Sequence, residues 1–97
     1  MSLRGNVTCP CCGYKTLQSE REWDICSICF WEDDPYQRDE IHETGANPIS
    51  LVEAQMNYQK IGACERTMLK NVRKTNSVDK KGDDWINYIP HSRKSSS

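Results

Sequence analysis

The sequence predicts a small α+β domain in which zinc-ribbon-like β-hairpins, built on two C-x-x-C knuckles, pack against one main helix around a stabilising metal ion. Three observations predict this fold: the paired C-x-x-C motifs, one well-capped helix, and a shortage of apolar residues. The 97-residue chain has a single Phe and a negative mean hydropathy. A core this small needs disulfide bonds or a bound metal for stability. We expect one domain over residues 1–90 and a disordered tail over residues 91–97.

The metal-binding part is expected over residues 6–34, with two short hairpins over residues 6–31. Residues 7–8 can lead into the first cysteine turn as a strand, and residues 14–17 can lead out of it. Trp23 and Ile25 lie two positions apart, as residues on one face of a strand do. They predict a strand of the second hairpin.

The helical part is expected over residues 50–75. Ser50 and Glu53 have the spacing of a reciprocal capping box, and Gly62 is a natural terminator, so the clearest helix lies between them. A second helical piece is expected over residues 65–74. The core-facing side of the main helix is expected to carry apolar residues at helical spacing: Leu51, Ala54, Tyr58 and Ile61.

Two further segments carry predictions of their own. Residues 32–49 are acidic and contain Pro35 and Gly45, so they predict a loop. Residues 85–89 are rich in aromatic and β-branched side chains and predict a short strand that ends at Pro90.

Four cysteines have the spacing of a metal-binding site. Cys9 and Cys12 form one C-x-x-C pair, and Cys26 and Cys29 form a second pair after thirteen intervening residues. Two residues between cysteines allow a tight turn to direct both sulfur atoms at one ion, and two such turns complete a tetrahedral Cys₄ site. Gly13 suits the position after the first turn. The pattern favours structural zinc, with iron as the alternative because thiolates suit both metals.

The other two cysteines are surplus to this site. Cys11 lies inside the first turn, where it could replace a ligand or point outward, and Cys64 is expected as a buried or half-buried thiol. A nucleophilic role for either requires a base such as His42 or His91 nearby. Because four cysteines already close the site, both histidines are expected at the surface. A thioredoxin-type redox pair needs a single C-x-x-C at a helix N-terminus, so it is disfavoured.

Composition and charge limit the compartment and the partners. No apolar run follows the polar first residues, and no stretch is long enough to span a bilayer, so we expect neither a signal peptide nor a membrane protein. A cytoplasmic location, in which thiols stay reduced, is expected. Up to residue 45, nine acidic residues outnumber four Lys and Arg, whereas nine Lys and Arg outnumber five acidic residues from residue 46 on. The acidic metal-binding half argues against a phosphate-binding zinc finger.

Taken together, these motifs resemble the small cysteine-rich CPCC family. The resemblance covers residues 8–66. It rests on residues 9–14, residues 26–34 and three shorter stretches: Gly45-Ala46-Asn47, Leu51-Val52-Glu53-Ala54 and Gly62-Ala63-Cys64. The resemblance implies one of a group of mostly bacterial and phage-borne proteins that are expected to bind a metal. It implies no particular activity. The residues from 67 on follow no recognised family pattern, so it implies no role for them.

The segment after the second cysteine pair is a candidate partner-binding site. Trp31, Glu32, Asp33 and Asp34 combine an aromatic ring with three carboxylates, which could anchor a partner and attract a basic one. The alternative is that the aromatic ring covers the metal site and that the acids are solvated. We favour the covering role for the aromatic residue and partner binding for the acids.

The function expected from these features is that of a non-enzymatic zinc-binding protein, a protein–protein interaction module such as an adaptor, an inhibitor or an immunity-like protein. The sequence contains no phosphate loop and no nucleophile with an evident base. The alternative is a zinc-ribbon nucleic-acid-binding protein that uses the basic segment 66–81, with Trp85 and Tyr88 for base stacking. A thiol or iron redox protein is the third hypothesis.

Overall fold

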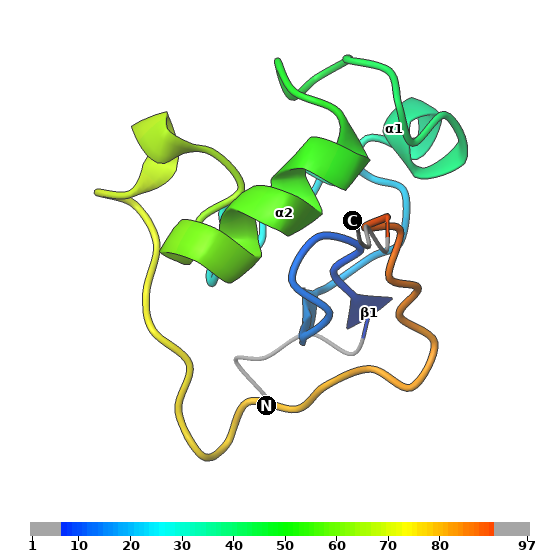
Figure 1. Ribbon diagram of the computed structural model, residues 1–97. Coiled ribbons are helices and arrows are strands. Elements are labelled where there is room, and N and C mark those ends of the chain that lie inside the picture. The colour runs from blue at the N-terminus through cyan, green and yellow to red at the C-terminus, as the bar shows by residue number, and fades with distance from the viewer. Residues whose placement is uncertain (1–6, 91–97) are drawn as a thin grey trace.

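A computed structural model describes residues 7–90, and Figure 1 shows its elements along the chain. Two antiparallel strands and a main helix confirm the α+β class. The predicted tail, residues 91–97, lies outside the described residues. The elements are β1 (Val7–Thr8), β2 (Lys15–Leu17), α1 (Pro35–Asp39), α2 (Leu51–Ile61) and the 3₁₀ turn η1 (Arg66–Met68).

The first cysteine turn connects β1 to β2. These strands pair antiparallel, with Val7 opposite Leu17 and an irregularity in the register next to this pair. An isolated bridge between Tyr14 and Lys81 brings the C-terminal part of the chain to the edge of this hairpin. The C-terminal part therefore lies beside the metal-binding part.

The second cysteine turn is supported by one antiparallel bridge, between Ile25 and Glu32. The prediction of a strand with Trp23 and Ile25 on one face is wrong. Both side chains are 50% exposed, and Trp23 has a φ of +60°. A residue in the left-handed region interrupts extended backbone, so a regular strand cannot continue through this position.

Helix α2 begins and ends where the sequence predicts. Ser50 and Glu53 form the reciprocal capping box, and Gly62 ends the helix in the left-handed conformation with a φ of +81°. Its buried face differs from the predicted one, since Tyr58 and Ile61 are only half-buried. The first half of the helix covers the core, and its buried positions are Leu51, Val52, Ala54 and Gln55.

The predicted loop over residues 32–49 contains the short helix α1. Asp34 caps α1 by accepting a backbone N–H of the first turn at 2.8 Å, and Pro35 occupies that turn. An Asp-Pro pair is a helix-start signal, and the loop interpretation overlooked it. Later in the same segment, the side-chain amide of Asn47 donates to the carbonyl of Glu32 at 2.8 Å and accepts its N–H at 3.0 Å. Side chains thus order a segment with little regular structure.

Two predicted C-terminal elements also differ from the structure. In the described segment 65–74 the regular structure is the short η1, and residues 85–89 form no strand. The side-chain amide of Gln55 takes the place of a neighbouring strand. It donates to the carbonyl of Ile86 at 2.9 Å and accepts the N–H of Tyr88 at 2.8 Å. Because a buried side chain satisfies these backbone groups, they need no strand partner.

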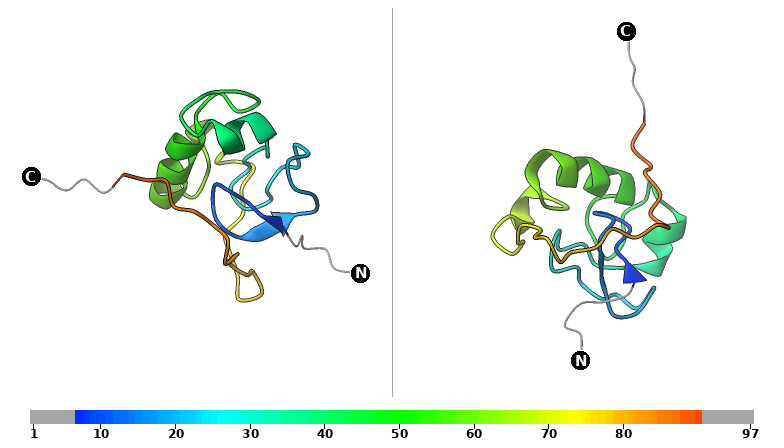
Figure 2. Two further views of the ribbon diagram at one scale, coloured as in Figure 1. Left: turned by 90° about the vertical axis from the view of Figure 1, so that its right-hand side faces the viewer. Right: turned by 90° about the horizontal axis from the view of Figure 1, so that it is seen from below.

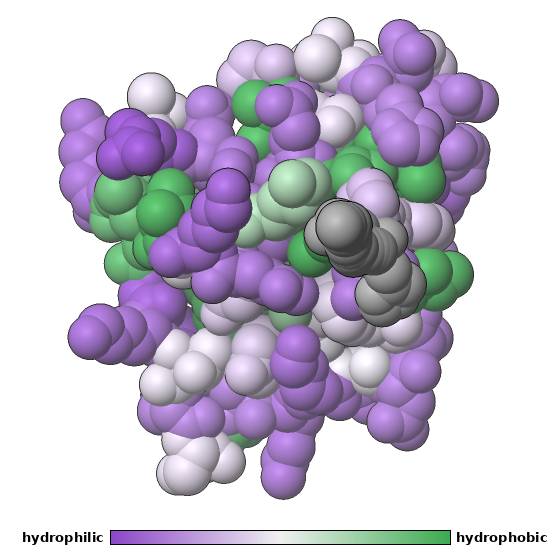
Figure 3. Space-filling model, in the orientation of Figure 1, coloured by the Kyte–Doolittle hydropathy of each residue, from purple (hydrophilic) through white to green (hydrophobic). Residues whose placement is uncertain are grey.

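The core is assembled around cysteines and a few apolar side chains. Figure 3 shows a mainly hydrophilic surface with separate apolar patches, as expected for this composition. Within residues 7–90, no helix has the length and apolar character needed to cross a membrane. The buried cluster consists of Cys9, Cys11, Cys12, Leu17, Cys26, Ile28, Cys29, Trp31, Leu51, Ala54 and Cys64.

Candidate metal centre

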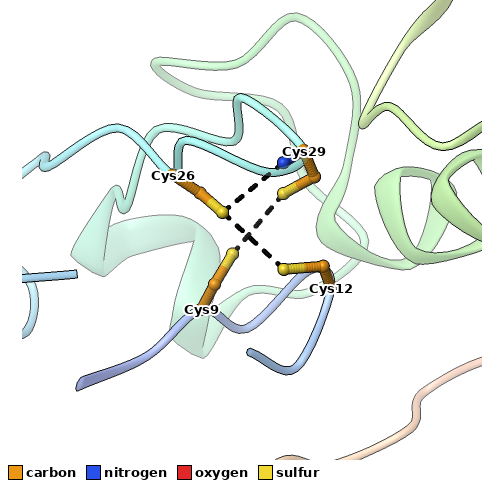
Figure 4. Close-up of side chains that lie close together, drawn as sticks. All are labelled: Cys9, Cys12, Cys26 and Cys29. Atoms are coloured by element: carbon orange, nitrogen blue, oxygen red, sulfur yellow. Dashed lines mark hydrogen bonds between the residues drawn. The ribbon is translucent and has the colours of Figure 1, made fainter. Parts of the chain in front are cut away.

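The structure brings the four predicted metal ligands together in one buried cluster. The Sγ atoms of Cys9, Cys12, Cys26 and Cys29 all lie within 4.8 Å of one another. Figure 4 shows the four sulfur atoms directed at a common point. Across the two turns, the Sγ atoms of Cys9 and Cys29 are 3.6 Å apart, as are those of Cys12 and Cys26. No side chain of the four is more than 2% exposed.

The two cysteine turns have the same backbone structure. In the first turn, the N–H of Gly13 donates to the carbonyl of Cys9 at 2.9 Å. In the second, the N–H of Phe30 donates to the carbonyl of Cys26, also at 2.9 Å. Gly13 and Phe30 are both left-handed, with φ values of +87° and +69°. A turn of this kind directs both sulfur atoms of a C-x-x-C pair at one ion.

A second matching hydrogen bond closes each turn. The N–H of Cys9 donates to the carbonyl of Tyr14 at 2.8 Å, and the N–H of Cys26 donates to that of Trp31 at 2.9 Å. The two turns therefore present their cysteines in equivalent ways. Backbone hydrogen bonds position the ligands in the fold.

The Sγ atom of Cys26 accepts several hydrogen bonds. The hydroxyl of Thr16 donates to it at 3.0 Å, and the N–H groups of Ile28 and Cys29 donate at 3.3 and 3.5 Å. Hydrogen bonds from the neighbouring thiols, that of Cys12 first among them, lower the pKa of Cys26. Because donors stabilise a thiolate, Cys26 is the sulfur of the cluster that ionises first.

The other three thiols of the cluster retain their protons unless a cation is present. Burial raises the pKa of Cys9 and of Cys29 well above the usual value. The pKa of Cys12 is raised chiefly by its hydrogen bond with Cys26. Buried thiols in contact cannot all ionise without compensating positive charge, which a bound metal ion supplies. The cluster is therefore suited to a metal rather than to free thiolates.

The spacing of the sulfur atoms fits a tetrahedral ion. Zn–S bonds of about 2.3 Å place the sulfur atoms of a regular tetrahedron about 3.8 Å apart. The two cross-turn distances of 3.6 Å and the overall limit of 4.8 Å bracket this value. Iron with four thiolates has the same geometry. The donor set thus fits both metals.

Cys11 and Cys64 lie outside the group of four ligands, although both are buried, at 1% and 2% exposure. Cys11 is therefore not directed at solvent, and of the two states expected for Cys64, buried or half-buried, the structure shows the buried one. Burial raises the pKa of Cys64 to about 12, so little of it is thiolate at neutral pH. Of the two bases considered, His42 is exposed and His91 lies outside the described residues.

A family model described as cysteine-rich CPCC matches residues 7–79, which include both cysteine turns and every helix of the fold. The chain belongs to the cysteine-rich CPCC family. The match extends past residue 66, where the resemblance by motifs ended, so the family pattern also includes the segment after α2. A comparison with curated proteins gives no match.

In this CPCC protein, the acidic segment after the second turn is not an exposed patch. Trp31 and Asp33 are fully buried and Asp34 is 7% exposed, while Glu32 is half-buried. Asp33 accepts a backbone N–H at 2.8 Å and forms an ion pair with Arg38. A buried carboxylate persists because it is paired and hydrogen-bonded. Three of the four side chains predicted to bind a partner are therefore buried within the fold.

Two supporting residues escaped the sequence analysis. Besides its ion pair, Arg38 donates to the carbonyl of Thr8 at 3.1 Å and so connects α1 to β1. Gln55 donates to the carbonyl of Pro10, inside the first cysteine turn, at 2.8 Å. Gln55 lies four positions after Leu51 and therefore on the same face of α2. That spacing is the signal that could have located it.

Proposed function

We propose that this chain is a non-enzymatic zinc-binding protein whose metal centre is structural. The observation that carries the proposal is the closed group of four buried cysteine sulfurs. Structural zinc sites have four protein ligands, whereas catalytic zinc sites keep one position for water or substrate. Removal of the ion is expected to unfold the part of the chain that is built on it.

Zinc is the metal that we propose, and iron is the alternative. Zinc has no redox chemistry and no geometric preference from its d electrons, which suits a centre that only joins two turns. Metal analysis of protein from its own cells tests the choice. A colourless protein with one zinc per chain is expected, and a coloured protein with iron would argue against it.

We further propose that the protein acts by binding another protein, as an adaptor, an inhibitor or an immunity-like protein. A groove of about 580 Å³ lies between the C-terminal half of α2 and residues 69–75. Figure 3 shows apolar side chains gathered near the C-terminal end of α2. The apolar residues that line the groove include Tyr58, Ile61, Leu69 and Val72.

The rim of this groove is positively charged. The guanidinium of Arg73 is paired with Asp79 at 2.8 Å. Lys74 also lines the groove, and it forms no ion pair with a described residue. An apolar groove beside an unpaired ammonium group fits a partner segment that carries an apolar side chain next to a carboxylate.

The interaction is tested by pull-down from the native cell with two matched variants. Leu69→Asp places a carboxylate in the groove. Val78→Asp is the control, because it makes the same kind of change outside the groove at a similarly exposed position. The side chain of Leu69 is 41% exposed and that of Val78 is 51% exposed. We expect a stoichiometric partner with the wild type and with Val78→Asp, but not with Leu69→Asp. No stoichiometric partner for the wild type, or equal capture by both variants, would refute the proposed surface.

Nucleic-acid binding through residues 66–81 is the alternative, and contacts within the fold weaken it. Arg73 is paired with Asp79, and Lys81 lies over two aromatic rings, one of them Trp85. The indole N–H of Trp85, a candidate for base stacking, donates to a backbone carbonyl at 2.9 Å. Affinity for RNA or DNA that weakens steeply as salt rises would favour this alternative.

A thiol redox protein or a cysteine hydrolase has the least support. All six cysteines are buried, and the high pKa of Cys64 leaves it a weak nucleophile at neutral pH. Thiols of the native protein are therefore expected to react slowly with alkylating reagents. Rapid alkylation of one cysteine in the folded protein would favour the enzyme hypothesis.

A further inference from the structure

The segment of residues 80–88, here called the strap, lies across the first cysteine turn. It begins directly after the end of the family match. The N–H of Lys15 donates to the first carbonyl of the strap, and the N–H of Gly82 donates to the carbonyl of Gly13, each at 2.8 Å. In Figure 2 this segment, in orange, crosses the blue N-terminal hairpin. The strap is thus attached to the hairpin that carries two of the four metal ligands.

Side chains of the strap donate hydrogen bonds to backbone carbonyls of the first turn. Trp85 donates its indole N–H to the carbonyl of Pro10 at 2.9 Å, and Lys81 donates its Nζ to the carbonyl of Cys12 at 3.2 Å. The amide of Gln55 donates both to the Pro10 carbonyl and to a strap carbonyl. Helix α2, the turn and the strap therefore meet at one point, and opening of the strap breaks several of these bonds together.

Lys81 joins the strap to the first turn through three contacts of its side chain. Its Nζ lies 4.8 Å from the ring centroids of Tyr14 and of Trp85. Two cation–π contacts thus add to its hydrogen bond with the carbonyl of Cys12, a metal ligand. Because Zn²⁺ with four thiolates carries a net charge of −2, an ammonium group beside the site also stabilises it electrostatically.

The second cysteine turn is covered by a different segment. The carbonyl of Cys29, which is equivalent to that of Cys12, accepts the N–H of the buried Cys64 at 2.9 Å. The strap, in contrast, is mostly exposed and has no regular secondary structure beyond its bridge at Lys81. Segments of this kind open by local fluctuation at less cost than global unfolding. Opening of the strap uncovers the first turn and leaves the second in place.

We propose that the strap controls metal release: its opening frees the turn that holds Cys9 and Cys12, and Lys81 is the residue that keeps it closed. This inference rests on the zinc centre proposed above. With the strap closed, the carbonyl of Cys12 accepts a hydrogen bond from Lys81, and Trp85 packs against Gly13. With the strap open, a competing chelator reaches the sulfur atoms of the first turn before the chain unfolds. Loss of the positive charge at Lys81 therefore speeds metal exchange.

The rate of zinc transfer from the full-length protein to an excess of a chromogenic chelator tests this proposal. Lys81→Met removes the ammonium group and retains an unbranched side chain of similar length. Lys80→Met makes the same change one position earlier, and its side chain makes none of these contacts with the first turn. We expect release about tenfold faster for Lys81→Met, with Lys80→Met within about twofold of the wild type. Equal rates in all three proteins, or equal acceleration by both variants, would overturn the proposal.

Hydrogen exchange at the Gly82 amide and the Trp85 indole reports opening of the strap without relying on the metal. Both groups donate to the first turn, at 2.8 and 2.9 Å. In zinc-bound Lys81→Met we expect both to exchange faster while the amides of α2 are unchanged. Uniformly faster exchange would show global destabilisation and overturn the role of the strap. A wild type that binds no zinc refutes the zinc centre and the strap together, whereas zinc release independent of Lys81 refutes the strap alone.

Discussion

Gly13 and Phe30 occupy the same position in the two cysteine turns, and both are left-handed, with φ values of +87° and +69°. Each donates its N–H to the carbonyl of the first cysteine of its turn at 2.9 Å. Glycine adopts this conformation without steric cost, whereas a bulky residue there costs on the order of 1 kcal/mol or more. The second turn is therefore under strain that its surroundings must offset. A metal ion held by both turns would contribute to that stabilisation.

Gly13→Ala is predicted to destabilise the fold more than Gly62→Ala. Both glycines are left-handed, so both lose backbone stability when a Cβ is added. A Cβ at Gly13 would lie 3.0 Å from a ring carbon of Trp85, whereas one at Gly62 meets no atom within 4 Å. We expect losses in the free energy of unfolding of about 1 kcal/mol for Gly62→Ala and about 2–3 kcal/mol for Gly13→Ala. Denaturant titration measures both, and equal losses would count against packing of the strap on the first turn.

Serine substitutions should separate the metal ligands from the surplus thiols. Cys12→Ser or Cys26→Ser removes a ligand and is expected to abolish stoichiometric zinc binding and unfold the metal-binding part. Cys11→Ser is expected to retain one zinc and to cost about 1–3 kcal/mol, because a hydroxyl replaces a buried thiol. The absorption spectrum of the cobalt-substituted protein gives the ligand set. Equal damage from Cys11→Ser would show that Cys11 is a ligand.

Acidification is predicted to release the metal and unfold the chain in parallel. In the metal-free fold, burial raises the pKa of Cys9 and Cys29, so these thiols hold their protons. In the unfolded chain the pKa of a cysteine thiol is about 8.5. Binding of the metal ion to four thiols at neutral pH therefore displaces about four protons. Because the bound state needs thiolates, its stability is lost as the pH falls. Circular dichroism and metal release should follow one transition, and a fold that persists after complete metal loss would refute the structural role of the ion.

Removal of one partner from the Asp33–Arg38 ion pair is predicted to be strongly destabilising. The side chain of Asp33 is fully buried and that of Arg38 is 18% exposed. Arg38→Met leaves a buried carboxylate without its counter-charge and is expected to cost about 3 kcal/mol or more. The double variant Asp33→Asn/Arg38→Met buries no charge, so it should cost less than the sum of the single changes. Urea denaturation of the wild type, of Asp33→Asn, of Arg38→Met and of the double variant measures the coupling. Losses in the free energy of unfolding that simply add would contradict the prediction.

Features determined by neighbouring residues could be predicted from the sequence. Ser50, Glu53 and Gly62 act within one turn of α2, so both ends of that helix were predictable. The C-x-x-C pairs likewise specify their own turns, and the structure brings their four sulfur atoms together. Local chemistry of this kind is visible in a short stretch of sequence.

Features determined by distant contacts could not be predicted in the same way. Residues 85–89 have the composition of a strand, but Gln55, far away in the chain, satisfies their backbone groups instead. The sequence shows that Asp33 is charged but not that it is buried beside Arg38. The left-handed conformation of Phe30 has no glycine to indicate it. For residues 85–89 and for Asp33, a tertiary contact decides the structure rather than the local preference.

Native mass spectrometry of protein purified gently from its own cells tests the central claim most directly, because it weighs the chain together with its metal and any bound partner. A structural Cys₄ centre predicts one zinc ion per chain and six reduced cysteines. Iron in place of zinc, or no metal with oxidised cysteines, would contradict the structural zinc centre and favour a redox protein.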